Sequence, residues 1–123
     1  MKTIVLVGFG GFIGAVARYK LGGLVLHHTA AFRFPLSTFV VNIVGCLAAG
    51  ILAGMVIKHD SFSPNARLFL FTGILGGFTT FSAFGLDTFY LLQRHDLKWA
   101  ALNATLSPLI GILAVWLGAK LVS

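Results

Sequence analysis

The residues best suited to chemistry are hydroxyls and glycines that interrupt a long apolar stretch. Gly76 and Gly77 are followed closely by Thr79, Thr80 and Ser82. Paired glycines cost a helix about 1 kcal/mol per residue relative to alanine, and the hydroxyls can bond the main chain in place of the helix. Non-helical backbone at membrane depth is tolerated only where protein or a water-filled cavity surrounds it. We therefore expect a broken helix that lines an internal path; the alternative is a continuous helix with a small-residue packing face.

Such a break would expose main-chain carbonyls, which is how unwound membrane helices coordinate cations. The carbonyls of Gly76 and Thr79 lie on either side of the expected break. They could hold a monovalent cation, best if two chains contribute.

Aromatic and amide groups near the break could receive an anion. Phe81 and Phe84 are three residues apart and so share a helix face. The edge of a phenyl ring is electropositive, and the amide N–H of Asn42 and the hydroxyl of Ser82 are hydrogen-bond donors. Together they could replace water around a small anion without a full positive charge. The alternatives are phenylalanines that pack or face lipid, and an Asn42 that bonds between helices.

The spans contain few other polar groups. Asn103 invites the same two interpretations as Asn42, and Asp87 is the only carboxylate within an apolar stretch. No carboxylate pair, Ser/His/Asp set or HExxH spacing can be assembled, so we expect no enzyme. A proton-coupled exporter would normally carry an intramembrane carboxylate, so the sequence favours a passive pathway over a pump.

The composition is that of an integral membrane protein. Of the 123 residues, 58% are hydrophobic and 10% are charged, against about 25% charged in soluble domains. The net charge is +6, but the cations fall at the ends of apolar runs, which is typical of anchoring to a lipid bilayer. No cluster of cations indicates nucleic acid as a partner.

The hydropathy predicts an all-α membrane protein with one domain, residues 1–123, and four transmembrane helices. A span takes about 20 apolar residues, and the predicted spans are about 3–26, 36–57, 66–92 and 99–119. Ser63 and Pro64 mark the start of the third span, which contains the break near its middle. Small residues recur four apart and predict close helix packing; the pairs are Gly10 with Gly14, Gly11 with Ala15, Gly45 with Ala49, Gly50 with Gly54, and Ala114 with Gly118.

The loop charges give little instruction about orientation. Both termini and the second loop share one side, which carries Lys2, Lys58, Arg67 and Lys120; the other side carries Arg18, Lys20, Arg33, Arg94 and Lys98. The positive-inside rule predicts orientation from a difference in the number of cations between the two sides. Here the difference, four cations against five, is nearly absent. We therefore expect dual topology and an antiparallel homodimer. The alternative is that Arg18 and Lys20 lie inside the helix and do not belong to this count.

The motifs together resemble one family, the Fluc (CrcB) family of bacterial fluoride channels. The resemblance rests on three stretches: Gly76 to Phe84, Val41-Asn42-Ile43-Val44-Gly45, and Gly10-Gly11-x-x-Gly14-x-x-Ala17-Arg18-Tyr19. It covers the whole chain, and the combination is specific. The resemblance implies a multi-pass protein of the bacterial inner membrane. Its function would be that of a passive, fluoride-selective channel exporting cytoplasmic fluoride.

The resemblance also implies an antiparallel dimer with two pores and a structural sodium ion at its centre. By position, Asn42, Phe81 and Phe84 match the fluoride pathway, with Ser82 as a further donor. Gly76 and Thr79 match the positions whose backbone carbonyls hold sodium. The role of Arg18 is left open. The chain departs from the family pattern at Ala83, Gly85, Asp87 and Pro108.

Two rival functions stay open. A small dual-topology multidrug or cation exporter would also have four helices, but it would want a membrane-embedded glutamate in its first span. The first span has none. A purely structural membrane subunit would need neither Asn42 nor a broken helix.

Overall fold

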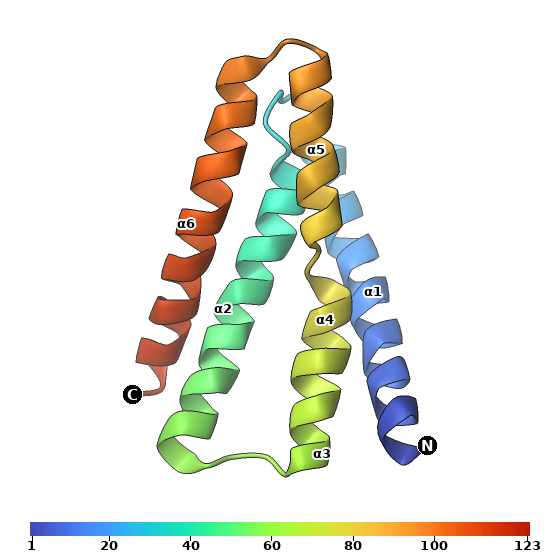
Figure 1. Cartoon of the computed structure of the whole chain (residues 1–123), viewed down its shortest axis with the longest axis vertical. Helices are drawn as coiled ribbons and strands as arrows, with labels where there is room; N and C mark the ends of the chain where they lie inside the picture. Colours follow the sequence, from blue (N-terminus) through green and yellow to red (C-terminus); the bar gives the residue numbers. More distant parts are fainter.

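The computed structural model describes residues 1–123, and every regular element is helical (Figure 1). The elements in chain order are α1 Lys2–Thr29, α2 Leu36–His59, α3 Pro64–Arg67, the π-helix η1 Leu68–Leu75, α4 Gly76–Phe78, α5 Phe81–Gln93 and α6 Leu97–Leu121. The segments α3, η1, α4 and α5 follow one another as a single interrupted rod. The fold is therefore all-α, and its third rod is bent, as the sequence predicts.

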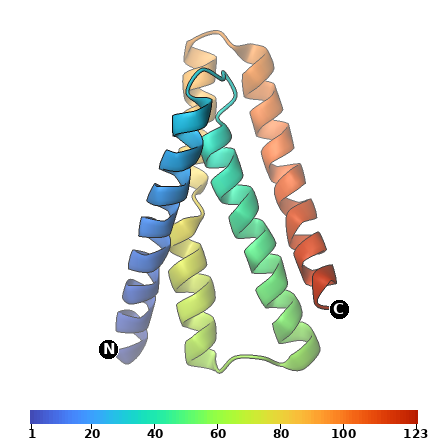
Figure 2. The ribbon, with the colours of Figure 1, turned by 180° about the vertical axis from the view of Figure 1, so that it is seen from behind.

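Four helical stretches are long and apolar enough to cross a membrane: Lys2–Thr29, Leu36–His59, Pro64–Gln93 and Leu97–Leu121. Each predicted span lies within one of them. Both termini and the α2–α3 connection lie at one end of the molecule (Figures 1 and 2). The α1–α2 and α5–α6 connections lie at the other end, so the loops fall on two sides as expected. Pro108 lies inside α6, which is continuous through it.

The connection before the third span is fixed by local side chains. The hydroxyl of Ser63 accepts a hydrogen bond from the amide of Ala66 at 3.2 Å, and Pro64 opens the helix. This is the start that the Ser-Pro pair predicts. Arg67 bonds the carboxylate of Asp60 at 2.8 Å. Asp60 itself ends α2 in the left-handed conformation, with φ of 49°.

Two pairs of helices pack closely against each other at glycine residues. The most extensive packing joins α2 to α6, followed by α1 to η1. A Cβ on Gly50 would meet the carbonyl of Val115, and a Cβ on Gly14 would meet that of Ile74. No side chain fits between backbones at these points. The structure thus confirms that Gly50 and Gly14, from two of the small-residue pairs, serve tight packing.

The paired glycines do not unwind the third span. Gly76 has helical angles, with φ of −61° and ψ of −36°, and Gly77 continues α4. Gly77 lies against α1 instead, where a Cβ would come within 2.5 Å of the carbonyl oxygen of Gly11. The expectation that Gly-Gly helps to break the helix is therefore wrong, since these glycines are used for packing. The break comes at Thr79 and Thr80.

Little of the chain is covered by its own side chains. Only 13 of the 123 residues are buried, and most of those are glycine or alanine. Large apolar side chains such as Phe12, Ile112 and Phe81 are exposed along the rods. Surfaces of this kind require hydrocarbon or another protein surface to cover them.

Candidate functional site

The break consists of two extended residues between helical segments. Thr79 has φ of −88° and ψ of 155°, and Thr80 has φ of −149° and ψ of 120°. The hydroxyl of Thr80 accepts a hydrogen bond from the amide of Ala83 at 3.1 Å and so caps α5. The hydroxyl of Thr79 donates to the carbonyl of Leu75 at 2.9 Å. The two threonines thus end one helix and begin the next.

Asn42 from α2 bonds the main chain of the break with both ends of its amide. Its Nδ2 donates to the carbonyl of Thr80 at 3.0 Å, and its Oδ1 accepts from the amide of Thr80 at 2.9 Å. Gly45, one turn further along α2, leaves room for the Thr79 side chain, which a Cβ would strike. Asn42 therefore makes the interhelical bond of the structural interpretation. Nδ2 carries a second N–H beyond the one bonded to Thr80.

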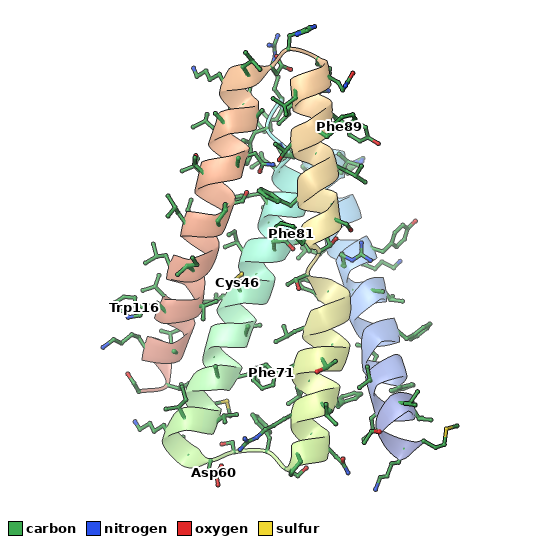
Figure 3. All side chains as sticks on the ribbon, viewed as in Figure 1. Cys46, Asp60, Phe71, Phe81, Phe89 and Trp116 are labelled. Carbon is green, nitrogen blue, oxygen red and sulfur yellow. The ribbon has the colours of Figure 1, made fainter.

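A cavity of about 510 Å³ lies beside the break, between α2, the third span and α6. It is lined by Asn42, Gly45, Cys46, Ala49, Phe71, Leu75, Gly76, Thr79, Thr80, Phe81, Phe84, Ser107 and Pro108. Figure 3 shows Phe81, Cys46 and Phe71 following one another along this side of the molecule, from the break toward α3. The fold thus gathers residues from three separate stretches of sequence around one space.

Most of the predicted site residues meet at this cavity. Asn42, Phe81 and Phe84 line it, as do Gly76 and Thr79. The Phe81 and Phe84 rings lie with centroids 5.7 Å apart, and Phe81 is 84% exposed. Ser82 does not line the cavity, but its hydroxyl lies 3.1 Å from that of Thr80. The predicted anion groups and cation groups are therefore neighbours.

Sequence reasoning missed part of the lining. Thr80, Ser107, Cys46 and Phe71 also face the cavity. Thr80 could have been found as the helix cap that must follow a break, because threonine is favoured there. Ser107, Cys46 and Phe71 carry no such signal, because their position depends on how α6, α2 and η1 pack.

A second amide, Asn103 on α6, is fully buried with 2% of its surface exposed. Its Nδ2 donates to the hydroxyl of Thr88 at 2.9 Å, and its Oδ1 accepts from the hydroxyl of Ser107 at 2.8 Å. Thr88 in turn donates to the carbonyl of Phe84. The bond between Asn103 and Thr88 joins α6 to the intact part of α5, which is the structural interpretation of Asn103.

Arg18 lies inside the first span and reaches the break from α1. Its Nε donates to the carbonyl of Gly77 at 3.1 Å. Lys20 also lies within α1, so the alternative raised from the sequence holds for both residues. Without them, three cations remain on that side of the chain against four on the other. The charge bias stays small.

A smaller cavity of about 350 Å³ opens at the end of the molecule that carries the α1–α2 and α5–α6 connections. Its polar lining includes Thr38, Arg33, Arg94 and Asp87. Arg33 bonds the carboxylate of Asp96 at 3.2 Å. Asp87 thus faces an open, charged pocket near the end of the third span, as its position in the sequence indicates.

The class of protein follows from these features. The chain is a four-span membrane protein whose third span is unwound beside a cavity lined by aromatic, amide and main-chain groups. A family model described as "CrcB-like protein, Camphor Resistance (CrcB)" matches residues 5–119. The chain belongs to this family.

Curated relatives match almost the whole chain. The fluoride-specific ion channel FluC of Methylobacillus flagellatus is 50% identical over 122 residues, which cover 99% of this chain and 95% of the relative. The FluC proteins of Flavobacterium psychrophilum and Nitratidesulfovibrio vulgaris are 43% and 42% identical, each over 96% of this chain and 94% of the relative. These relatives are named as channels and not as enzymes or exporters, in agreement with the sequence.

Proposed function

We propose that this protein is a passive, fluoride-selective channel that lets cytoplasmic fluoride leave across the bacterial inner membrane. The observation that carries the proposal is an unwound stretch within the third span, with a highly exposed phenylalanine beside it. Phe81 is 84% exposed and lines the same cavity as Asn42. The relatives named fluoride-specific ion channels support the choice of ion.

The proposed anion path is lined by uncharged groups that attract fluoride without binding it tightly. Phe81, Phe84 and Asn42 line the same cavity, and they offer it the positive edges of phenyl rings and a second amide N–H. The hydroxyl of Ser82 is a further donor close by. None of these groups has a formal charge, so a dehydrated fluoride ion would be stabilised only modestly. Weak binding of this kind is what conduction requires.

The proposed assembly is an antiparallel homodimer with two pores. One copy covers little of its own apolar surface, and the cavity beside the break opens outward. Four loop cations on one side against three on the other give little preference for either orientation. In a two-fold symmetric dimer the same surface meets itself, so each copy supplies one equivalent path. Reporter proteins that are active on only one side of the membrane, fused to the C-terminus, test the dual topology. We expect signals from reporters of both kinds, and a signal from one side alone would reject the antiparallel dimer.

The proposed sodium site uses the carbonyls of Gly76 and Thr79 from both copies. Both residues line the cavity at the break, and unwound carbonyls are the ligands that membrane helices offer to sodium. The residues therefore fit such an ion. When bound, it would supply a fixed positive charge that joins the two breaks at the dimer centre.

The test of the proposal is ion efflux from liposomes that contain the purified protein. We expect a fluoride electrode to record rapid release without any imposed proton gradient, and a chloride electrode to record almost none. Equal release of the two ions would overturn the proposal. Fluoride release that required a proton gradient would instead indicate an exporter.

A further inference from the structure

We infer that Asn42 and Thr80 are positioning residues for the cation site, because their side chains bind the two amides that would otherwise occupy the Gly76 and Thr79 carbonyls. The inference rests on the sodium site of the proposed function. It assigns Asn42 a role besides facing the anion, and it assigns the Thr80 hydroxyl, which the sequence marked only as a possible main-chain partner, a specific role at the ion site. Neither residue would touch the ion through its side chain.

Helix geometry fixes the partner that each of these amides would otherwise have. In an α-helix each amide bonds the carbonyl four residues earlier. The amide of Thr80 would therefore bond Gly76, and the amide of Ala83 would bond Thr79. In the structure the amide of Thr80 donates to Oδ1 of Asn42 at 2.9 Å, and the amide of Ala83 donates to the hydroxyl of Thr80 at 3.1 Å. Each carbonyl of the proposed site has lost its helical partner to one identifiable side chain.

Three neighbouring carbonyls, unlike those of Gly76 and Thr79, accept hydrogen bonds from side chains. Those of Leu75, Gly77 and Thr80 each accept a hydrogen bond from a side chain: from Thr79 at 2.9 Å, from Arg18 at 3.1 Å and from Asn42 at 3.0 Å. These donors reduce the attraction of the three oxygens for a cation. The pattern of side-chain bonds thus distinguishes the carbonyls of residues 76 and 79 from those of Leu75, Gly77 and Thr80.

The extended conformation of the break depends on the same bonds. Buried amides without partners are costly within a membrane. If Asn42 or the Thr80 hydroxyl is removed, the amides of residues 80 and 83 regain their best available partners by rewinding toward the helix. Rewinding would engage the carbonyls of Gly76 and Thr79 and so withdraw them from the ion.

The experiment measures sodium bound per dimer by elemental analysis, after the purified dimer is equilibrated over a range of sodium concentrations. Thr80→Val removes the hydroxyl at nearly constant shape, and Thr80→Ser restores it. Asn42→Leu removes the amide. Asn103→Leu is the matched control, because it removes a buried amide that bonds the third span at Thr88, on the α5 side of the break. We expect Thr80→Val and Asn42→Leu to raise the half-saturating sodium concentration at least about tenfold, with Thr80→Ser and Asn103→Leu unchanged.

Amide exchange provides an independent measurement on the same proteins. In sodium-free buffer, the pattern of amide protection at residues 80 and 83 should change in Asn42→Leu and Thr80→Val but not in Asn103→Leu. Sodium affinity unchanged in both Thr80→Val and Asn42→Leu would overturn this inference while leaving the sodium site intact. A wild-type dimer that binds no sodium would overturn the site and the inference together. If Asn42→Leu fails to assemble, the Thr80→Val and Thr80→Ser pair decides alone.

Discussion

Asn42 and Asn103 place the same amide group against the same span in two different ways. Asn42 bonds the carbonyl and the amide of Thr80, so it replaces helical hydrogen bonds with bonds to another helix. Asn103 bonds the hydroxyls of Thr88 and Ser107, and it adds bonds to helices that are already complete. A buried amide in a membrane span can therefore either create a site or join two helices.

The difference has an energetic consequence. Removing Asn103 exposes side-chain hydroxyls that can find other partners, and such interhelical bonds are worth about 0.6 kcal/mol on average and at most ~1.7 kcal/mol. Removing Asn42 leaves main-chain groups of the break unsatisfied in a medium without water, where each costs several kcal/mol. The chain can avoid that cost only by changing the conformation of the break.

The largest expected effect concerns the aromatic groups at the break and those on the intact part of α5. We expect Phe81→Ile to lower fluoride efflux at least about tenfold, because isoleucine offers no positive ring edge; tenfold corresponds to ~1.4 kcal/mol in the barrier. Phe89→Ile is the matched control, since Phe89 is half exposed on α5 and lines neither cavity. Efflux from liposomes measures both, and equal losses would reject a special role for Phe81.

A second effect concerns the helix that supports the break from the other side. We expect Gly14→Ala to destabilise the protein by about 1–3 kcal/mol, the usual cost of overpacking. Its new methyl would meet the backbone of Ile74 and lie 2.9 Å from the amide nitrogen of Phe78. Gly8→Ala is the control, because nothing lies within 4 Å of its new methyl. Reversible unfolding measures both, and equal stability of the two variants would show that α1 does not fix this segment.

The smallest effect belongs to the α5–α6 contact. We expect Asn103→Leu to lower the free energy of unfolding by about 0.6–1.7 kcal/mol. Thr88→Val removes the same bond from the other helix, so the double variant should cost less than the sum of the two single variants. A double-mutant cycle of unfolding free energies measures this. Strict additivity would mean that the bond at 2.9 Å contributes nothing to stability.

The sequence was sufficient for the spans, for the presence of a break and for the role of the threonine hydroxyls in it, but not for the role of the glycine pair. Apolar runs of the right length predict the four spans, and Ser63-Pro64 predicts where the third begins. The prediction for Gly76-Gly77 was wrong, because a glycine pair is equally typical of a weakened helix and of a helix that packs closely against a neighbour. Only the packing of Gly77 against Gly11 distinguishes the two.

Contacts over long sequence distances were beyond prediction. Arg18 and Gly77 meet because α1 lies along the third span, and nothing local to either residue indicates it. The sequence did indicate that Asn42 needs a partner, since a lone amide in an apolar stretch requires one. It could not indicate that the partner is the main chain of Thr80, because that depends on the register of α2 against α4.

The most direct test compares fluoride efflux from liposomes containing the wild type, Asn42→Leu or Asn103→Leu at equal protein content. We expect Asn42→Leu to lower the wild-type rate at least about tenfold and Asn103→Leu to stay within about threefold of it, since a change of ~0.6 kcal/mol alters a rate by about that factor. Equal rates for the two variants, whether high or low, would contradict the claim that the amide at the break shapes the ion path.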